Sequence, residues 1–490
     1  MLSAQEAATK TQELYDCLAR RRPMIDNFDR YYEGEQPLKY ASKEWAKFHK
    51  ERYKGFSDNW CAVVIDALNE RLRVSGLQVG SEPDDAERQL WDDWQRNDMD
   101  AQSSQGFLQT IGSTRSAVIV WGDENDEPVY TWEHPSQVYV EYSAEFVAKP
   151  LYAIKAWQDD KREYATLYTD EQVFKWQRPL PMEGIKDGRT SSGLYVNAAG
   201  FSATGSWEPR QGEGDDTWPL SHPLGELPVV EIQNRPRLKR GPISDISGVM
   251  AMQDAINLLW AYLFGAADHA SFPARVIMGQ EPPKVPMLDK DGQKIGEKAI
   301  DIEELRQGRM LWLTGDKSSI DQFDSAKLDV FTDVIDININ HVAAQSRTPA
   351  HYFIANKGMS NLNGETLKAT ETPLVKKGGE FQLYSSNGLA KIFRLGAKVR
   401  GNNALADSIG PHSIQWADME IRSEAQRSDA LIKMKQMGYP MRHLLKMNGH
   451  SPNEIDTIMK QIEAEQAADP LYAAEQAVRR GADYEPDLTV

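Results

Sequence analysis

Four consecutive segments in the middle of the chain constrain its fold more than any other feature. A helical pattern over 242–270 precedes a segment rich in proline and glycine at 271–326, and a second helical pattern covers 328–344. A polar loop then opens onto another helical stretch, and its residues are Asn356, Lys357, Gly358, Met359, Ser360, Asn361, Leu362, Asn363 and Gly364. This order predicts two apolar helices joined by an insert, followed by a loop that leads into a third helix.

The first pattern begins at Pro242, which suits the first position of a helix because the N–H that it lacks would have no partner there. Apolar residues then recur at helical spacing, among them Ile246, Val249, Met250, Ile256 and Trp260. Small residues at 248, 251 and 255 form a stripe that would let a neighbouring helix come close. Taken alone, this segment favours a buried core helix.

The second pattern is apolar around more than half of its circumference if the segment is helical, and Phe331 and Ile335 belong to that surface. The remaining narrow face carries polar residues spaced i, i+4, i+7 and i+11, namely Asp329, Asp333, Asp336 and Asn340. A helix packed between neighbours, with one acidic stripe in contact with water, suits a ring that lines a channel. Two alternatives stay open, an ordinary surface helix and a strand over 335–340, where apolar and polar residues alternate.

The insert at 271–326 is predicted to be compact and of mixed α/β structure. It contains an Asp291-Gly292 turn signal and a strand-like run from Arg309 to Leu313. Asp289 to Gly292 has a superficial likeness to a calcium-binding loop. It lacks the spaced carboxylates and the terminal glutamate of such a loop, so we discount a calcium site.

The N-terminal half combines helices with short strands. Helical patterns cover 4–33, 63–72, 83–98 and 101–114. Six β-branched or aromatic segments between 117 and 176 are predicted to be antiparallel strands of one sheet, and a last strand is predicted over 227–233. Residues 184–217 are rich in Gly, Ser and Asp, which predicts an exposed loop.

Proline and glycine punctuate the C-terminal part. Pro373, Gly378, Gly379 and Gly388 interrupt the helical stretch 365–400, and we expect a kink or break there because proline removes a donor and clashes with the preceding turn. Further helices are predicted over 420–437, 441–447 and 452–468, the last opened by a capping box with proline at its first position. The polar tail after residue 469 is predicted to be loosely ordered.

Composition excludes several classes of protein. With 490 residues, 40% of them hydrophobic, the chain is expected to form two to four globular units. A net charge of −17 argues against a protein that binds nucleic acid by neutralising phosphates, though not against one that DNA slides past. Two cysteines, Cys17 and Cys61, supply no disulfide framework. We expect a soluble protein without membrane association, because no signal peptide or bilayer-length apolar run is found.

No catalytic motif is recognisable in the sequence. The Walker A, HExxH, GxSxG and dinucleotide-binding patterns are all missing. His341 and His351 lie ten residues apart without a nearby cysteine, so structural roles are favoured over metal binding. We therefore expect a protein that is not an enzyme, with no catalytic residue, no metal site and no cofactor.

Short motifs around the loop suggest a family. Thr348-Pro349-Ala350-His351, the Gly358-Met359-Ser360 loop and the helix start Gly364-Glu365-Thr366-Leu367-Lys368 follow one another, and Tyr31-Tyr32-Glu33-Gly34 lies near the N-terminus. In these motifs and in the order of its elements over nearly the whole chain, the sequence resembles the portal proteins of long-tailed phages.

The resemblance implies an α+β, mostly helical fold, that of a portal-type ring subunit with wing, stem, clip and crown regions. Carried over by position, the wing covers 1–241, the stem helices 242–270 and 327–345, and the clip 271–326. The tunnel loop and the helix behind it cover 346–400, a helical crown covers 401–469, and a flexible tail covers 470–490.

Portal proteins form rings, usually of twelve copies, at one capsid vertex of the virion. The resemblance implies a homo-oligomer assembled in the host cytoplasm, with double-stranded DNA in its channel. It implies as partners the terminase large subunit, the major capsid and scaffold proteins, and a head–tail adaptor protein. Another phage head-assembly protein, or less plausibly an unrecognised hydrolase, remains the alternative.

Within such a ring, four groups of residues acquire roles. Asp329, Asp333, Asp336 and Asn340 would line the channel, and residues 356–364 would form the tunnel loop. Arg347, Lys357 and Lys368 would offer weak contacts to DNA phosphates. The apolar residues expected to pack subunits are Ile246, Val249, Met250, Ile256, Trp260, Phe331 and Ile335.

Overall fold

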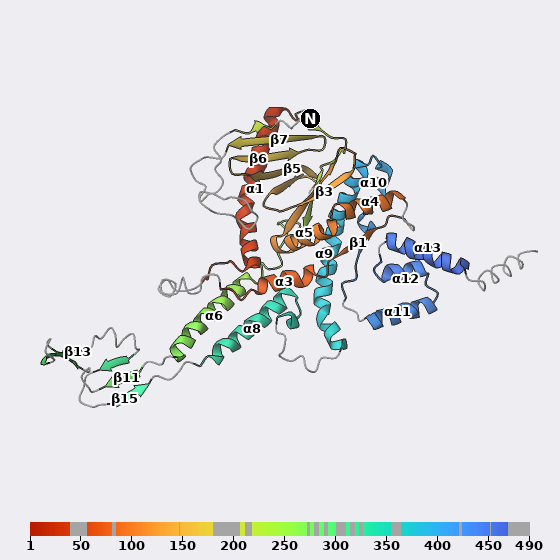
Figure 1. Ribbon diagram of the computed structural model, residues 1–490. Helices are drawn as coiled ribbons and strands as arrows, with labels where there is room; N and C mark the ends of the chain where they lie inside the picture. Colours follow the sequence, from red (N-terminus) through yellow and green to blue (C-terminus); the bar gives the residue numbers. More distant parts are fainter. Residues whose placement is uncertain are drawn as a thin grey trace, which may run out of the picture. The chain divides into compact units, whose positions relative to one another are not determined.

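The chain folds into two compact units (Figure 1). Unit 1 comprises Met1–Glu33, Cys61–Gly248 and Ser346–Val490, and unit 2 comprises Gly34–Trp60 and Val249–Gln345. The structure is a computed structural model. It describes residues 1–39, 56–80, 85–146, 148–179, 206–210, 218–271, 275–278, 284–288, 293–299, 310–313, 319–322, 327–353, 364–420, 424–450 and 452–468.

In unit 1, helix α1 (Ala4–Glu33) packs on the largest antiparallel sheet (Figure 1). Ser3 and Glu6 cap the helix reciprocally, since the Glu6 N–H donates to Ser3 Oγ and the Ser3 N–H donates to Glu6 Oε2. The strand order is β4-β5-β6-β7-β8, with β9 paired to β7. The strands are β4 (Val138–Tyr142), β5 (Pro150–Gln158), β6 (Arg162–Tyr168), β7 (Gln172–Pro179), β8 (Glu208–Pro209) and β9 (Leu220–Ser221).

The second sheet of unit 1 has the order β10-β2-β3 and is packed against two helices. It is formed by β2 (Arg115–Gly122), β3 (Pro128–Glu133) and β10 (Val229–Gln233), all antiparallel. Helices α5 (Met99–Ser113) and α9 (Gly364–Val399) contact this sheet. Phe107 of α5 meets Phe381 of α9 edge to face at 5.4 Å, in a core that also contains Trp132.

The prediction of a single sheet is therefore wrong. Strands β3 and β4 follow each other in sequence but belong to different sheets. A turn at Pro135, closed by the Gln137 N–H donating to the His134 carbonyl, separates them. Alternation of apolar and polar residues specifies which face of a strand is buried, but it does not specify which other strand pairs with that strand.

The prediction of a break within 365–400 is also wrong. Helix α9 is continuous over 36 residues and includes Pro373. Two of its glycines serve packing, because a side chain at Gly378 would collide with Met419 and one at Gly388 would crowd Ile232, whereas Gly379 has open space around it. Pro373 is exposed on the surface of this helix.

The other predicted helices of unit 1 are confirmed. They are α3 (Trp60–Asn69), which begins in unit 2, α4 (Asp85–Arg96), α11 (Glu424–Gln436), α12 (Met441–Met447) and α13 (Pro452–Ala468). Elements absent from the sequence prediction are α10 (Asn403–Ser408), the 3-10 turns η1 (Ala350–Tyr352) and η3 (Pro411–Ser413), and the antiparallel pair β1 (Val74–Leu77) and β16 (Ile414–Trp416). The pair joins residues more than 300 positions apart, which no local pattern could indicate.

Unit 2 contains two long helices and the insert between them. Helix α8 (Asp329–Ser346) confirms the helical interpretation of the second apolar pattern over the strand. Helix α6 (Met250–Ser271) begins eight residues after Pro242, so the predicted start is wrong. The reason lies at Asp245, whose N–H donates to the Ile111 carbonyl and whose buried side chain is held by other groups, which keeps this segment out of helical geometry.

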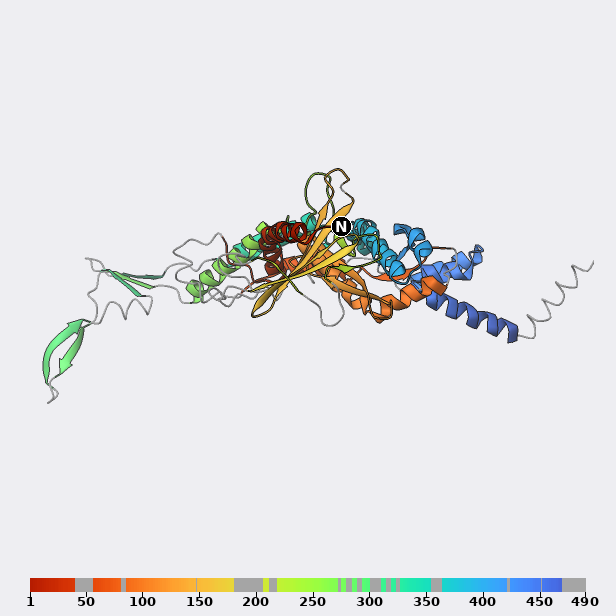
Figure 2. The same ribbon diagram turned by 90° about the horizontal axis from the view of Figure 1, so that it is seen from above.

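The described part of the insert consists of short strands. β11 (Arg275–Met278) lies between parallel β14 (Met310–Leu313) and antiparallel β15 (Ser319–Gln322). β12 (Lys284–Leu288) and β13 (Lys294–Ala299) form a separate twisted antiparallel pair (Figure 2). Residues 289–292, most of 184–217 and the tail from 469 onward lie outside the described residues. Within 184–217, Trp207 is buried and donates to Gln12, so at least this residue is not part of an exposed loop.

Candidate functional site

Helix α8 presents an acidic stripe to solvent. Asp329, Asp333 and Asn340 are exposed and Asp336 is half-buried. Their spacing places them on one side of the helix. The opposite part of the helix is buried, through Ile335, Ile339 and Val342. The four polar residues named from the sequence therefore form a continuous surface of the single chain.

A second, apolar stripe runs beside the acidic one. Val330, Val334 and Ile337 are 60%, 40% and 54% exposed, and each directly follows an aspartate of the acidic stripe. Successive helical residues are offset by about 100°, so the two stripes lie next to each other around the helix. An apolar row left in water is characteristic of a surface that another protein covers.

The residues expected to pack subunits divide into two groups. Ile246, Val249, Ile256 and Ile335 are buried within the single chain. Met250, Trp260 and Phe331 are half-buried. The first group therefore stabilises the interior of the subunit itself. The sequence analysis did not single out Val330, Val334 and Ile337, because helical periodicity alone cannot show which apolar face stays uncovered.

Helix α6 is held within unit 2 by polar contacts around Asp58. The indole N–H groups of Trp260 and Trp60 both donate to Asp58 Oδ2, at 2.8 and 3.0 Å. Gln253 Oε1 accepts the Trp60 main-chain N–H at 2.8 Å, and Asn257 Oδ1 accepts that of Asp58 at 3.0 Å. Gln253 and Asn257 are buried, and these bonds compensate for removing their amides from water.

Residues 356–363, which the sequence analysis expects to form the tunnel loop and which include Lys357, lie outside the described residues, and Gly364 is the first residue of α9. Of the other two cations proposed for DNA contact, Lys368 is exposed near the start of α9. Arg347 adopts a left-handed backbone conformation with φ 57°, and its Nη2 lies 3.2 Å from Glu380 Oε2. Arg347 precedes the loop by nine residues and Lys368 follows it by four.

A buried arginine connects the two ends of this loop. Arg71 Nη2 lies 2.5 Å from the Tyr352 hydroxyl and 2.6 Å from Glu371 Oε2. His351 Nε2 is 2.7 Å from the other oxygen of Glu371, and the Tyr352 hydroxyl donates to Glu70 at 3.0 Å. Burial, and after it Glu70, raises the pKa of Tyr352, although Arg71 opposes the shift. We call residues 70, 71, 351, 352 and 371 the loop clamp.

A second anchor holds the middle of α9. Lys377 Nζ lies 2.7 Å from Asp245 Oδ2 and donates to the Ser346 carbonyl at 3.0 Å, and the side chains of Lys377 and Asp245 are 2% and 0% exposed. Asn234 and Arg235 complete the carboxylate shell at 2.9 and 3.2 Å. Burial alone would raise the pKa of Asp245, but Lys377, Asn234 and Arg235 together lower it.

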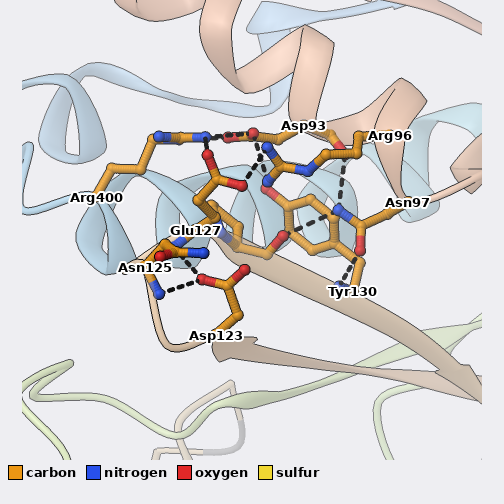
Figure 3. Close-up of polar contacts among 9 residues, drawn as sticks. Asp93, Arg96, Asn97, Asp123, Asn125, Glu127, Tyr130 and Arg400 are labelled. Carbon is orange, nitrogen blue, oxygen red and sulfur yellow. Dashed lines mark hydrogen bonds and ion pairs between the residues drawn. The ribbon is translucent and has the colours of Figure 1, made fainter.

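A third anchor lies just beyond the end of α9 (Figure 3). Arg400 binds the buried Asp93 through two nitrogens, at 2.6 and 2.5 Å. Arg96 lies 3.0 Å from Asp93 and 2.6 Å from Glu127, which links α4 to the turn between β2 and β3. Bidentate arginine–carboxylate pairs fix geometry as well as charge. Helix α9 is thus attached to unit 1 near its start, in its middle and at its end.

Neither a metal site nor a membrane span is found among the described residues. Nowhere among them do three His, Cys, Asp or Glu side chains gather in a way that could hold a metal ion. In the same part of the chain, no helix combines the length and the hydropathy needed to cross a bilayer. The buried residues Arg71, Asp93, Asp245 and Lys377 hold the position of α9 and the base of the loop.

A family model and two related proteins all point to the same family. A family model described as "Phage portal protein, SPP1 Gp6-like" matches residues 11–469. The portal protein of Mycobacterium phage D29 is 24% identical over 428 residues, covering 83% of this chain and 78% of that protein. The portal protein of Mycobacterium phage L5 is 23% identical over 390 residues, covering 76% and 71%.

Among solved structures, one described as "Neck of native GTA particle computed with C12 symmetry" aligns with a TM-score of 0.40 and 11% identity, covering 84% of this chain and 94% of the other. That score is too low to support an argument about the fold. The family match covers nearly the whole chain, including the two long helices, the insert and the loop. This chain belongs to the phage portal protein family of the SPP1 Gp6-like type.

Proposed function

We propose that this chain is one subunit of a ring, with twelve copies, at one capsid vertex of the virion. The ring forms the channel for packaging and ejecting double-stranded DNA. A separate terminase large subunit drives the DNA, and the ring also binds the major capsid and scaffold proteins and a head–tail adaptor protein. The subunit is not an enzyme and is assembled in the host cytoplasm. Membership of the portal family supports this proposal.

The observation that carries the proposal is the pair of stripes on α8. A ring subunit needs a lateral surface for its neighbour and an inner surface for the channel. Val330, Val334 and Ile337 provide an apolar row that a neighbouring copy would cover. Asp329 and Asp333 lie on the adjoining face, which would then be left to line the channel.

Acidic walls suit a channel through which DNA must slide. Twelve copies would carry twelve times −17, or about −200 charges. Salt screens such charges beyond about 10 Å at 0.1 M, so repulsion acts only near contact. Tight non-specific binding of DNA requires neutralised phosphates, which an acidic surface does not provide. Arg347, Lys357 and Lys368 would supply only weak, transient phosphate contacts beside the loop.

Packaging velocity tests the acidic lining. Replacing Asp329, Asp333 and Asp336 together by Lys should slow DNA translocation, because twelve copies would add phosphate-binding cations to the channel wall. Single-particle packaging measurements on assembled particles would show the change. The triple substitution Asp429→Lys, Glu463→Lys and Glu465→Lys, at exposed sites on α11 and α13, makes the same charge change away from α8 and serves as control. Unchanged velocity in fully assembled particles would remove the acidic-lining hypothesis.

Deleting residues 359–363 tests the tunnel loop. The loop clamp and the start of α9 hold both ends of the loop independently of its tip. We therefore expect rings to form normally while packaging or genome retention is impaired. Failure of the rings to assemble would instead assign the loop a structural role.

A further inference from the structure

The three-stranded sheet of unit 1 ends in loops of opposite charge. Strand β2 leads at Gly122 into the turn 123–127, and β10 leads at Gln233 into the loop 235–241. The two strands are antiparallel, with Gln233 opposite Arg115 at the start of β2. The turn and the loop therefore lie at opposite ends of the sheet, separated by about 25 Å along eight residues of β2.

The turn 123–127 is acidic and well ordered. Asp123, Glu124 and Asp126 are exposed. Asp123 Oδ1 accepts the main-chain N–H groups of Asn125 and Glu127, at 2.8 and 2.9 Å (Figure 3). Glu127 is held in turn by Arg96. The turn is thus fixed at its base, while Glu124 and Asp126 remain at the surface. We call it the acidic turn.

The loop 235–241 is basic and equally well anchored. Arg237, Lys239 and Arg240 are exposed, and Leu238 between them is fully exposed. Asn234 closes the base, because its carbonyl accepts the Ile243 N–H at 3.1 Å and its side chain donates to the Ile243 carbonyl at 2.8 Å. We call this segment the basic loop.

The three cations of the basic loop have no carboxylate partner among the residues that the structure describes. Arg237 Nε donates to the Gly241 carbonyl at 2.8 Å, which stiffens the loop without neutralising its charge. In a chain of net charge −17, such a group is suited to an acidic partner. The exposed leucine favours a protein surface over DNA, since phosphate contacts use charged and polar groups.

We propose that the basic loop of one copy docks against the acidic turn of the next copy around the ring. The proposal rests on the ring of the proposed function. A cyclic ring of more than two copies uses a heterologous interface, in which two different patches of each subunit meet. Opposite ends of one sheet supply two such patches with complementary charge. The contact fixes the register between neighbours and speeds their association.

Two charge-reversed variants test the contact. Lys239→Glu/Arg240→Glu retains Arg237 and changes the charge of the exposed residues 237–240 from +3 to −1. Glu124→Lys/Asn125→Lys/Asp126→Asn retains Asp123 and changes the charge of the exposed residues 123–126 from −3 to +1. Asn suits the left-handed conformation of residue 126, with φ 56°. Lys433→Glu/Lys435→Glu on α11 makes the same charge change as the first variant at a remote exposed site and serves as control. Circular dichroism would check that each variant is folded.

Mass photometry of the full chain would measure assembly against protein concentration. Each reversed variant should need at least about tenfold more protein than wild type for half-assembly, because like charges then meet at the interface. An equimolar mixture of the two should restore rings, since alternating copies again pair opposite charges. A chain that carries both reversals should also assemble by itself. The control should assemble like wild type.

Several outcomes would overturn the contact. If the wild-type protein forms rings and the reversed variants assemble equally well, the proposed contact is wrong, but the proposed ring still holds. The proposed contact is also wrong if an equimolar mixture of the two variants assembles no better than either variant alone. Normal rings of the Lys239→Glu/Arg240→Glu variant that have lost affinity for a double-stranded DNA probe would assign the loop to nucleic acid. Wild-type protein that never forms rings would refute both this contact and the proposed function.

Discussion

Replacing Lys377 by Met tests whether α9 is held by its buried ion pair. The substitution keeps the length of the side chain and removes the ammonium that lies 2.7 Å from Asp245 Oδ2 and donates to the Ser346 carbonyl. Asp245 would remain fully buried with one partner fewer.

The expected loss in the free energy of unfolding depends on the groups that still contact the Asp245 carboxylate. Removing one partner of a buried ion pair costs about 3–5 kcal/mol, because the other charge is left uncompensated. Asn234 and Arg235 still contact Asp245, so we expect a loss near the lower end, about 3 kcal/mol. Restoring neutrality with Asp245→Asn in the Lys377→Met background should recover part of it.

Urea unfolding followed by tryptophan fluorescence would measure the loss, at one protein concentration because assembly also stabilises the chain. Lys376→Met is the matched control, since Lys376 is the exposed neighbour on the same helix, and it should change stability by less than about 0.5 kcal/mol. Equal stability of the Lys377→Met and Lys376→Met proteins would refute the reasoning.

Acid titration gives a second readout of the same pair. The pKa of Asp245 is lowered in the folded chain, so the unfolded state binds more protons as the solution is acidified. The stabilisation is therefore complete above about pH 4 and is lost as the pH falls through the folded pKa. In the Lys377→Met protein this acid-dependent loss should be smaller.

Three further predictions concern packing, assembly and pH. Gly106→Ala should lower the free energy of unfolding by about 1–3 kcal/mol, since a methyl group there would overlap the Trp132 ring. Gly248→Ala is the control, because open space surrounds that residue, and thermal unfolding should show it to be nearly neutral. Ile337→Asp should leave the monomer folded, because that residue is 54% exposed, yet abolish rings in negative-stain images; intact rings would contradict the apolar stripe. Burial lowers the pKa of His222, so the melting temperature should fall as the pH drops below about 6.5, and His222→Gln should weaken this dependence.

Local patterns predicted the helices well, since amphipathic spacing and capping depend on neighbouring residues. The helix opened by Ser3 and Glu6 and the helical form of α8 follow from such signals. Signals of the same kind failed where tertiary contacts prevailed. Pro242 does not begin a helix because Asp245 is fixed elsewhere, and Pro373 does not end one because α9 is anchored on both sides of it.

The site was only partly predictable for the same reason. The acidic stripe of α8 spans twelve residues and can be found from its spacing. The loop clamp joins Arg71 to Tyr352 and Glu371, nearly 300 residues away, and none of the three stands out in its own sequence context. Which apolar residues stay exposed on α8 depends on the packing of the whole unit, so the apolar stripe required the structure.

The most direct test of the ring is an electron cryo-microscopy reconstruction of the purified full-length protein. The account predicts a closed ring, with twelve copies, in which Asp329 and Asp333 of every copy face the central channel and Val330, Val334 and Ile337 meet the adjacent copy. A compact monomer under all conditions, or a ring whose α8 carboxylates point away from the channel, would contradict it.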